Sequence, residues 1–354
     1  MSESGRHSVL LLEAGPDPDP VQLPRDLADG TRNSMTQHDW GYMHRPTFLD
    51  REFPLPRGRV VGGSSAVNTC IALRGQPEDF DEWAARGLSE WSWQHCLPAF
   101  KRFENDLDVR NEWHSQDGPL PLRRHPKEEW VPWQAAFVEA ALELGFPACY
   151  DSNEPGTIGA GAHTMNKLDG RRISVSEAFL TPAVRARENL TILAGKLALR
   201  VLLEGRRAVG VEVEGGERYQ GARIVLAAGA INTPALLLRS GVGPRDQIER
   251  IGREVLVEVP QVNRRLLDHP GCAFFLMPHR VDVQSVAHPL IQTVLRYASA
   301  DGGGNDHTSD MLVQPGSRFT LPGGDLAPVV LMCSVGKPRG NDGTLRFDSA
   351  DPSA

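Results

Sequence analysis

Two adjacent glycines followed by hydroxyl side chains constrain the fold of this chain more than any other feature. They lie in the segment Pro56–Ile71, which carries, in order, Val60, Val61, Gly62, Gly63, Ser64, Ser65 and Asn68. Glycines let a backbone turn tightly and present its N–H groups to a ligand. The hydroxyls and the amide add donors and acceptors that suit a phosphate or the polar edge of a flat heteroaromatic ring. The segment, called the clamp below, therefore predicts a cofactor site, with an ordinary surface turn as the alternative.

An acidic residue closes the apolar run near the N-terminus. The run from Ser8 to Glu13, followed by Ala14 and Gly15, predicts a buried parallel strand. In dinucleotide-binding units, an acid at the end of the second strand accepts hydrogen bonds from ribose hydroxyls and follows a Gly-x-Gly-x-x-Gly turn by about 20 residues. Only seven residues precede Ser8. A solvent-facing acid at a strand end is therefore the alternative for Glu13.

Helical and extended patterns follow one another through the middle of the chain. Apolar spacing, prolines and stop residues predict helices at 76–87, 92–105 and 132–145. From residue 189 onward, short apolar runs are separated by Gly205–Arg206 and Gly215–Gly216, which predicts a β-meander. Its strands are expected at 191–194, 198–204, 208–214 and 223–227.

A second glycine turn follows the last of these runs. Ile224–Ala228 is almost wholly apolar and predicts a buried strand, which leads through Gly229 and Ala230 to a helix capped at Thr233 and Pro234. The N-terminus of such a helix faces an anionic or electron-rich ligand in many nucleotide-binding sites. Packing without a ligand is the alternative.

The last part of the chain has a less regular pattern. Strands are expected at 273–277, 311–313 and 329–332, around a glycine-rich loop at 301–305. Asp268 stands directly before His269, as a catalytic pair would in sequence. Adjacent side chains seldom point at each other, so a role in fixing the loop is favoured for this pair.

Composition excludes several kinds of partner. The 354 residues carry a net charge of -7 and no run of lysines or arginines, so we expect no nucleic-acid partner. No apolar run approaches the ~20 residues of a membrane span. The cysteines are dispersed and form no Cys-x-x-Cys pair, which predicts a reducing cytoplasm, no disulfide framework and no metal site. They are Cys70, Cys96, Cys149, Cys272 and Cys333.

Two sequence motifs resemble the signatures of a known enzyme family. Gly58 to Asn68, with Ala72, Gly75 and Asp81 at matching spacings, resembles the first signature of the glucose-methanol-choline (GMC) oxidoreductases, and Gly229 to Pro244 resembles the second. Three shorter matches occur in the family's order: 10–15, 114–120 and 267–270. The resemblance covers nearly the whole chain. It implies FAD-dependent oxidation of an alcohol by hydride transfer to flavin N5.

The resemblance also implies an α/β fold. Residues 1–270 would form a Rossmann-like FAD-binding domain with a parallel sheet and a β-meander, in which 76–188 includes helical and loop segments that border the substrate side. Residues 271–354 would begin a substrate-binding domain built on an antiparallel sheet.

The family's cofactor contacts transfer to particular positions of this chain. Glu13 would bind the adenosine ribose, and Ala198 would meet the adenine end. Gly229 and Ala230 would approach the cofactor by backbone. The clamp would supply the remaining contacts along the flavin: Val60, Gly62, Gly63, Ser64, Asn68, Thr69, Cys70 and Ile71.

Val67 bears on how the flavin is held. In some family members, a histidine directly before the clamp asparagine is bonded covalently to the flavin. Val67 occupies that place here, so FAD is expected to be held non-covalently.

The family's remaining parts fall outside the sequence. Its first strand and Gly-x-Gly-x-x-Gly turn would precede Met1, and its catalytic histidine would follow Ala354. None of the histidines present matches that residue, and no catalytic residue is assigned. We therefore expect weak FAD binding and no alcohol oxidation by this polypeptide alone.

Other functions remain open at this stage. A non-catalytic protein that keeps a GMC-like fold for interaction is the main alternative. Hydrolase chemistry is disfavoured, because Gly62–Ala66 lacks the second glycine of a Gly-x-Ser-x-Gly elbow. The sequence does not distinguish among alcohols or among electron acceptors.

Overall fold

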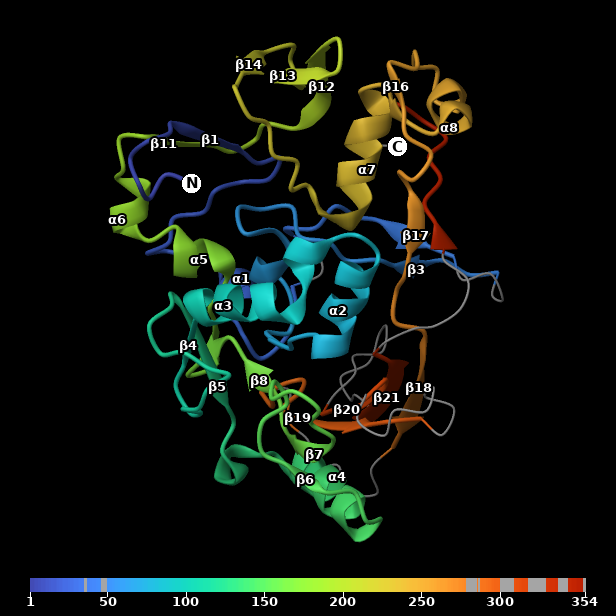
Figure 1. The fold of residues 1–354 in the computed structure, drawn as a ribbon. Helices are drawn as coiled ribbons and strands as arrows, with labels where there is room; N and C mark the ends of the chain where they lie inside the picture. The colour runs from blue at the N-terminus through green and yellow to red at the C-terminus, as the bar shows by residue number, and fades with distance from the viewer. Residues whose placement is uncertain are drawn as a thin grey trace.

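The computed structural model describes residues 1–34, 37–45, 50–277, 285, 287–299, 309–317, 329–336 and 343–352. These residues form a mixed α/β structure. Figure 1 shows small sheets at one end, a larger sheet at the opposite end and helices between them. Among the described residues, no helix combines the length and the apolar character needed to cross a membrane.

The N-terminal strand is parallel, as expected. β1 (Val9–Leu12) pairs in parallel with β11 (Leu190–Leu193), and Val9 lies opposite Leu190. The prediction that this strand is buried is wrong, because Leu10 is 39% exposed. Within the described residues the two strands form a sheet of their own, and the paired residues Leu10 and Thr191 are both exposed.

The β-meander has three strands rather than the four expected. β12 (Ala198–Glu204), β13 (Arg207–Val213) and β14 (Arg218–Gln220) form an antiparallel sheet in sequence order. The first predicted strand is β11, which pairs with β1 instead. Residues 223–227 form no strand, and Val225 is 58% exposed. An apolar run becomes a buried strand only where neighbours cover it, and this run has no strand beside it in the described structure.

Two of the predicted helices lie together at the centre of the molecule. α2 (Pro77–Ala85) begins after Gln76, whose N–H donates to Asp79 Oδ2 at 2.8 Å. α3 (Trp93–Phe103) packs against it through an aromatic cluster in which the ring of Phe80 lies 5.5 Å from that of Phe100. Both helices are confirmed, with ends within a few residues of those expected.

The larger sheet has six strands in the order β18, β21, β20, β19, β7, β6. The pairs are antiparallel except β6 with β7, and α4 (Pro132–Glu143) packs on β7 and β19 through Val138 and Leu295. The strands are β6 (Ala148–Cys149), β7 (Gly159–Ala162), β18 (Gly271–Leu276), β19 (Thr293–Tyr297), β20 (Met311–Gly316) and β21 (Val329–Val335). The three late strands predicted from the sequence are therefore confirmed. The loop expected at 301–305 lies outside the described residues.

This sheet draws strands from both sides of residue 270. The division into domains at 1–270 and 271–354 stays a prediction. β18 forms one edge of the sheet and is exposed along its length, with Phe274 56% accessible to solvent.

Shorter elements connect these parts. The helices are α1 (Arg25–Ala28), α5 (Val175–Phe179), α6 (Pro182–Arg185), α7 (Gly229–Arg239) and α8 (Arg245–Arg250). The strands are β2 (Met43–His44), β3 (Phe53–Pro54), β4 (Glu104–Asp106), β5 (Leu120–Arg124), β8 (Thr164–Met165), β9 (Lys167–Leu168), β10 (Arg171–Arg172), β15 (Val242–Gly243), β16 (Val257–Glu258), β17 (Arg264–Leu266) and β22 (Gly343–Thr344).

A buried histidine joins β4 to the loop before β7. His114 Nε2 lies 2.8 Å from Asp151 Oδ2, and Nδ1 lies 3.0 Å from Asp106 Oδ2 and 3.3 Å from Glu104 Oε1. Burial disfavours the charged imidazole, but the hydrogen bonds to Asp106, Asp151 and Glu104 outweigh it and raise the pKa of His114 to about 10.

Two arginines complete this group. Arg124 contacts Asp106 at 3.0 Å and Asp151 at 2.5 Å, and Arg74 pairs with Glu104. The imidazolium and the two guanidinium groups together balance the three carboxylates. We call these six residues the His114 cluster.

Replacing His114 with glutamine should lower the free energy of unfolding by about 3–5 kcal/mol at neutral pH, because the buried carboxylates lose a cation. Urea denaturation measures this loss, and H95Q, a change at an exposed histidine, should have little effect.

The pH dependence gives a second measurement on the same variants. The pKa of His114 is raised above its ordinary value of 6.5. Its stabilisation is therefore complete below about pH 6.5 and is lost as the pH rises towards about 10. Identical dependence of stability on pH in the wild type and H114Q would contradict the assignment.

Candidate functional site

The glycine pair of the clamp makes a left-handed turn. Gly62 and Gly63 have φ angles of 102° and 54°, and a turn of 3-10 helix follows at Gly63–Ala66. Val60, directly before the turn, is fully buried. The Ser64 hydroxyl lies at an exposed position and accepts a hydrogen bond from the Gly58 N–H at 3.2 Å. The turn predicted from the sequence is therefore present, and one hydroxyl already supports it.

Glycine permits a close backbone contact between the end of β1 and the clamp. A Cβ on Gly15 would lie 2.1 Å from the carbonyl oxygen of Arg59, far inside any allowed separation. The N–H of Val61 donates to the carbonyl of Pro16 at 3.0 Å. These contacts bring the segment after Glu13 against the start of the clamp turn.

Glu13 is partly buried at the same junction. Its Oε1 accepts a hydrogen bond from the Gly15 N–H at 2.7 Å. Burial raises the pKa of Glu13, although the hydrogen bonds from Gly15 and Ala14 and the charge of Arg59 oppose that rise. The carbonyl of Glu13 accepts from the Lys196 N–H at 2.8 Å, and Ala198 follows two residues later at the start of β12.

The second half of the clamp has an unusual backbone. Cys70 is fully buried with a φ of 64°, which few residues other than glycine adopt. Its N–H donates to Asn68 Oδ1 at 2.9 Å, and its carbonyl accepts from the Asn166 N–H at 2.9 Å. Thr69 and Ile71, on either side, are partly buried. Such strained conformations persist where the surroundings fix them, and they cluster at functional sites.

α7 begins at Gly229, ahead of the predicted cap. Gly229 has a φ of 82°, and both Gly229 and Ala230 are exposed. The sequence predicted that the helix starts after Thr233 and Pro234, and this is wrong. Pro234 lies within the helix, and Thr233 Oγ1 accepts from the Ala228 N–H at 3.1 Å.

Aromatic residues connect α7 to the clamp. Tyr42 donates its hydroxyl to Asn232 Oδ1 at 2.9 Å and stacks on Trp40 with ring centres 6.0 Å apart. The guanidinium of Arg59 lies 5.0 Å from the centre of the Trp40 ring. The first turn of α7 is therefore coupled to the residue that touches Gly15.

The residues present fit a cofactor with a phosphate or a polar ring edge. A Cβ on Gly63 or Gly229 would meet nothing within 4 Å, so both backbones border open space. The first turn of α7 has no side-chain cap from its N-cap residue, and its N–H groups can donate outward. Among the described residues, no group of three or more His, Cys, Asp or Glu side chains could hold a metal ion.

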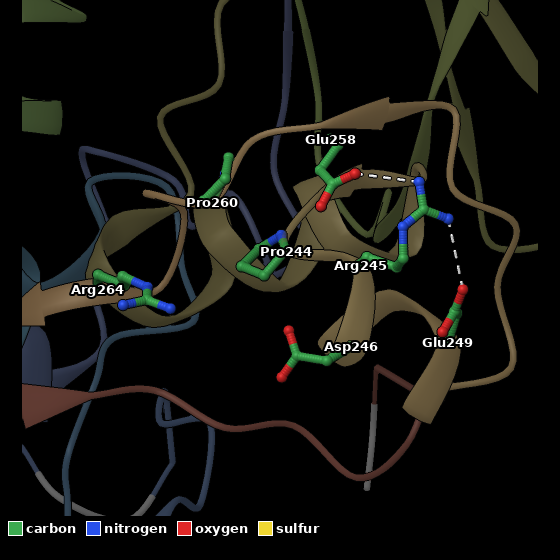
Figure 2. A pocket seen from close by; sticks show the side chains of 7 residues that line it. All are labelled: Pro244, Arg245, Asp246, Glu249, Glu258, Pro260 and Arg264. Atoms are coloured by element: carbon green, nitrogen blue, oxygen red, sulfur yellow. Dashed lines mark hydrogen bonds and ion pairs between the residues drawn. The ribbon is translucent and has the colours of Figure 1, made fainter.

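Two hollows on the described surface are lined by no clamp residue. The first has a volume of ≈ 320 Å³, and Arg245 pairs with Glu249 and Glu258 at its edge (Figure 2). A second, of ≈ 400 Å³, is lined by Leu199, Arg200, Glu212, Arg239, Arg253, Ala350, Asp351 and Pro352. None of the predicted site residues lines either hollow, although the second begins one residue after Ala198.

Sequence reasoning missed Arg172. The side chain is fully buried and donates to the carbonyls of Ala66 and Asn68 in the clamp. Its only sequence signal is its place after the Asp169–Gly170 turn, which says nothing about contacts with residues a hundred positions away.

Comparisons with known proteins agree on one family. A family model described as GMC oxidoreductase matches residues 40–271. The oxygen-dependent choline dehydrogenases of Brucella anthropi and Rhizobium meliloti are 38% and 36% identical to this chain over 277 residues, which is 76% of this chain and 49% of each relative. The chain thus spans about half the length of the curated relatives it matches.

Solved structures give the same result at the level of the fold. Pyridoxine 4-oxidase from Mesorbium loti superposes with a TM-score of 0.85 at 30% identity, covering 99% of this chain and 70% of that chain. Formate oxidase superposes with a TM-score of 0.82 at 23% identity, with 99% and 72% covered, and shows the fold alone.

The two clamp glycines should differ in their tolerance of a side chain. G62A should lower the free energy of unfolding by about 3 kcal/mol, because its φ of 102° is unfavourable and a Cβ would lie 2.9 Å from Ser176 Oγ. G63A should cost only about 1 kcal/mol, since 54° lies in the left-handed region, where the strain of a side chain is modest, and the space is open. Urea denaturation compares them, and equal losses would contradict the turn geometry.

Proposed function

This chain belongs to the GMC oxidoreductase family, and we propose that its clamp, together with Glu13, Ala198 and the first turn of α7, binds FAD for the oxidation of an alcohol. The observation that carries the proposal is the backbone contact between Gly15 and Arg59. That contact joins the ribose-binding acid expected from the family to the turn expected beside the flavin.

Each part of the site would have a distinct task. Glu13 would accept hydrogen bonds from the ribose hydroxyls, because its carboxylate is only partly buried beside the clamp, where the Gly15 N–H orients Oε1. The N–H groups around Gly63 and Gly229 would face the polar parts of the cofactor. When bound, the flavin supplies the acceptor for the hydride of the alcohol.

The clamp would hold the flavin ring by shape and backbone. Val60 and Asn68–Ile71 would lie along it, and the hydrogen bonds of Asn68 and Asn166 to Cys70 keep that backbone in one conformation. Val67 has an aliphatic side chain that cannot bond to the ring, which supports non-covalent binding.

The names of the relatives suggest the substrate class. Choline and pyridoxine, which appear in the names of two of these enzymes, are both small molecules with a primary hydroxyl group. We propose an alcohol of this class for the complete activity. The electron acceptor stays open.

Replacing Glu13 with glutamine should weaken FAD binding about tenfold, or ~1.4 kcal/mol. Glutamine keeps an oxygen for the Gly15 N–H but loses the charge that strengthens hydrogen bonds from ribose hydroxyls. Quenching of flavin fluorescence during titration of the whole chain measures the dissociation constant, with E204Q, at an exposed position of β12, as the control.

Two outcomes of that titration are informative. Absence of any FAD binding by the wild type would overturn the proposed function. Equal affinity of E13Q and the wild type would overturn the ribose role of Glu13 alone.

The expectation that this polypeptide alone does not oxidise alcohols stays a prediction. Adding choline or pyridoxine anaerobically to the FAD-loaded chain should leave the flavin absorbance unchanged. Bleaching of the flavin band would contradict it and would identify a substrate at the same time.

A further inference from the structure

One fully buried arginine binds main-chain carbonyls of two distant segments. Arg172, in β10, is 0% exposed. Its guanidinium donates to five carbonyl oxygens: Asn68 at 3.0 Å, Ala66 at 2.9 Å, Asp26 at 3.0 Å, Leu27 at 2.6 Å and Arg32 at 2.5 Å. The first two belong to the clamp, and the other three belong to α1 and the loop after it.

These bonds are not part of an ion pair. Within the described part of the chain, no carboxylate oxygen lies within 4.0 Å of the Arg172 guanidinium. A buried charge without a counterion is costly unless hydrogen bonds compensate it. The planar guanidinium has five N–H donors in fixed directions, so it compensates its charge only where carbonyls converge on it. The hydrogen bonds therefore hold the five carbonyl groups in position as well as the guanidinium of Arg172.

The hairpin that carries Arg172 is itself tied to the α1 loop. Gly170 accepts a hydrogen bond from the Gly30 N–H at 2.8 Å, and Arg171 forms a β-bridge with Asp29. The backbone of Arg172 is therefore held in place next to the loop after α1, and its side chain reaches the clamp from there.

We infer that Arg172 is a positioning residue of the clamp, which locks the backbone at Ala66 and Asn68 against the α1 segment. The strained turn at Cys70 begins two residues after one of these carbonyls. Locking that carbonyl keeps the strained backbone in the conformation that the flavin would meet. The link to flavin binding rests on the proposed function, whereas the locking itself does not.

Two nearby residues serve as matched controls. Lys167, on the paired strand β9, is also a buried cation, 3% exposed, and its Nζ makes no hydrogen bond in the described structure. K167M therefore removes a buried charge without removing a bond to the clamp. Arg124 is 7% exposed and belongs to the His114 cluster, so R124M removes a buried arginine elsewhere.

Amide hydrogen exchange of the whole chain without FAD tests the inference. R172M should speed exchange at least tenfold in peptides covering 26–34 and 60–72, because both segments lose their common anchor. R172K keeps the charge but has fewer donors, and it should restore part of the protection. K167M should leave these peptides unchanged, and R124M should speed exchange mainly around the His114 cluster.

FAD titration of the same variants adds the functional readout. R172M should bind FAD at least tenfold more weakly than K167M, with R172K between them. If R172M does not fold, R172K decides: faster exchange confined to 26–34 and 60–72 supports the inference.

The outcomes separate this inference from the proposed function. Exchange in 60–72 that is no faster in the Arg172 variants than in R124M overturns the positioning role, whatever FAD does. A wild-type chain that binds no FAD overturns the proposed function, while faster exchange in R172M still supports the locking of the clamp.

Discussion

The backbone contact between Gly15 and Arg59 is the constraint on which the site depends. The backbone at Gly15, just after β1, lies so close to the clamp that a Cβ atom there would overlap the carbonyl oxygen of Arg59. β11 pairs in parallel with β1. The N–H of Lys196, two residues before the meander, donates to the carbonyl of Glu13 directly after β1. Three segments widely separated in sequence thereby meet at one point, and the function proposed for the chain needs all three.

Buried charge is handled in two contrasting ways. In the described part of the chain, Arg172 pairs with no carboxylate and donates to main-chain carbonyls of the clamp and of the α1 segment. In the His114 cluster, whole charges offset one another, and the result is a joint between β4, β5 and the loop at Asp151. The first arrangement links the clamp to α1, whereas the second links β4 and β5 to the loop at Asp151.

Sequence reasoning succeeded where the signal was local. The proline in the first turn of α2, the apolar spacing of α4 and the glycines of the clamp each act within a few residues, and the structure contains all of them. It failed where distant partners decide the outcome. Residues 223–227 have the composition of a buried strand, but the residues that the structure describes place no strand beside them. Arg172 reaches Asp26 across 146 positions. No pattern within a window of the sequence contains that information.

The balance of charge in the His114 cluster has an evolutionary consequence. A single replacement that changes the charge at any of its six positions leaves a net charge among buried side chains. During evolution, a protein with only the first replacement would fold poorly until a second replacement restored the balance of charge. Relatives that differ at one of these positions should therefore differ at a second one as well, so that the cluster is inherited or exchanged as a set.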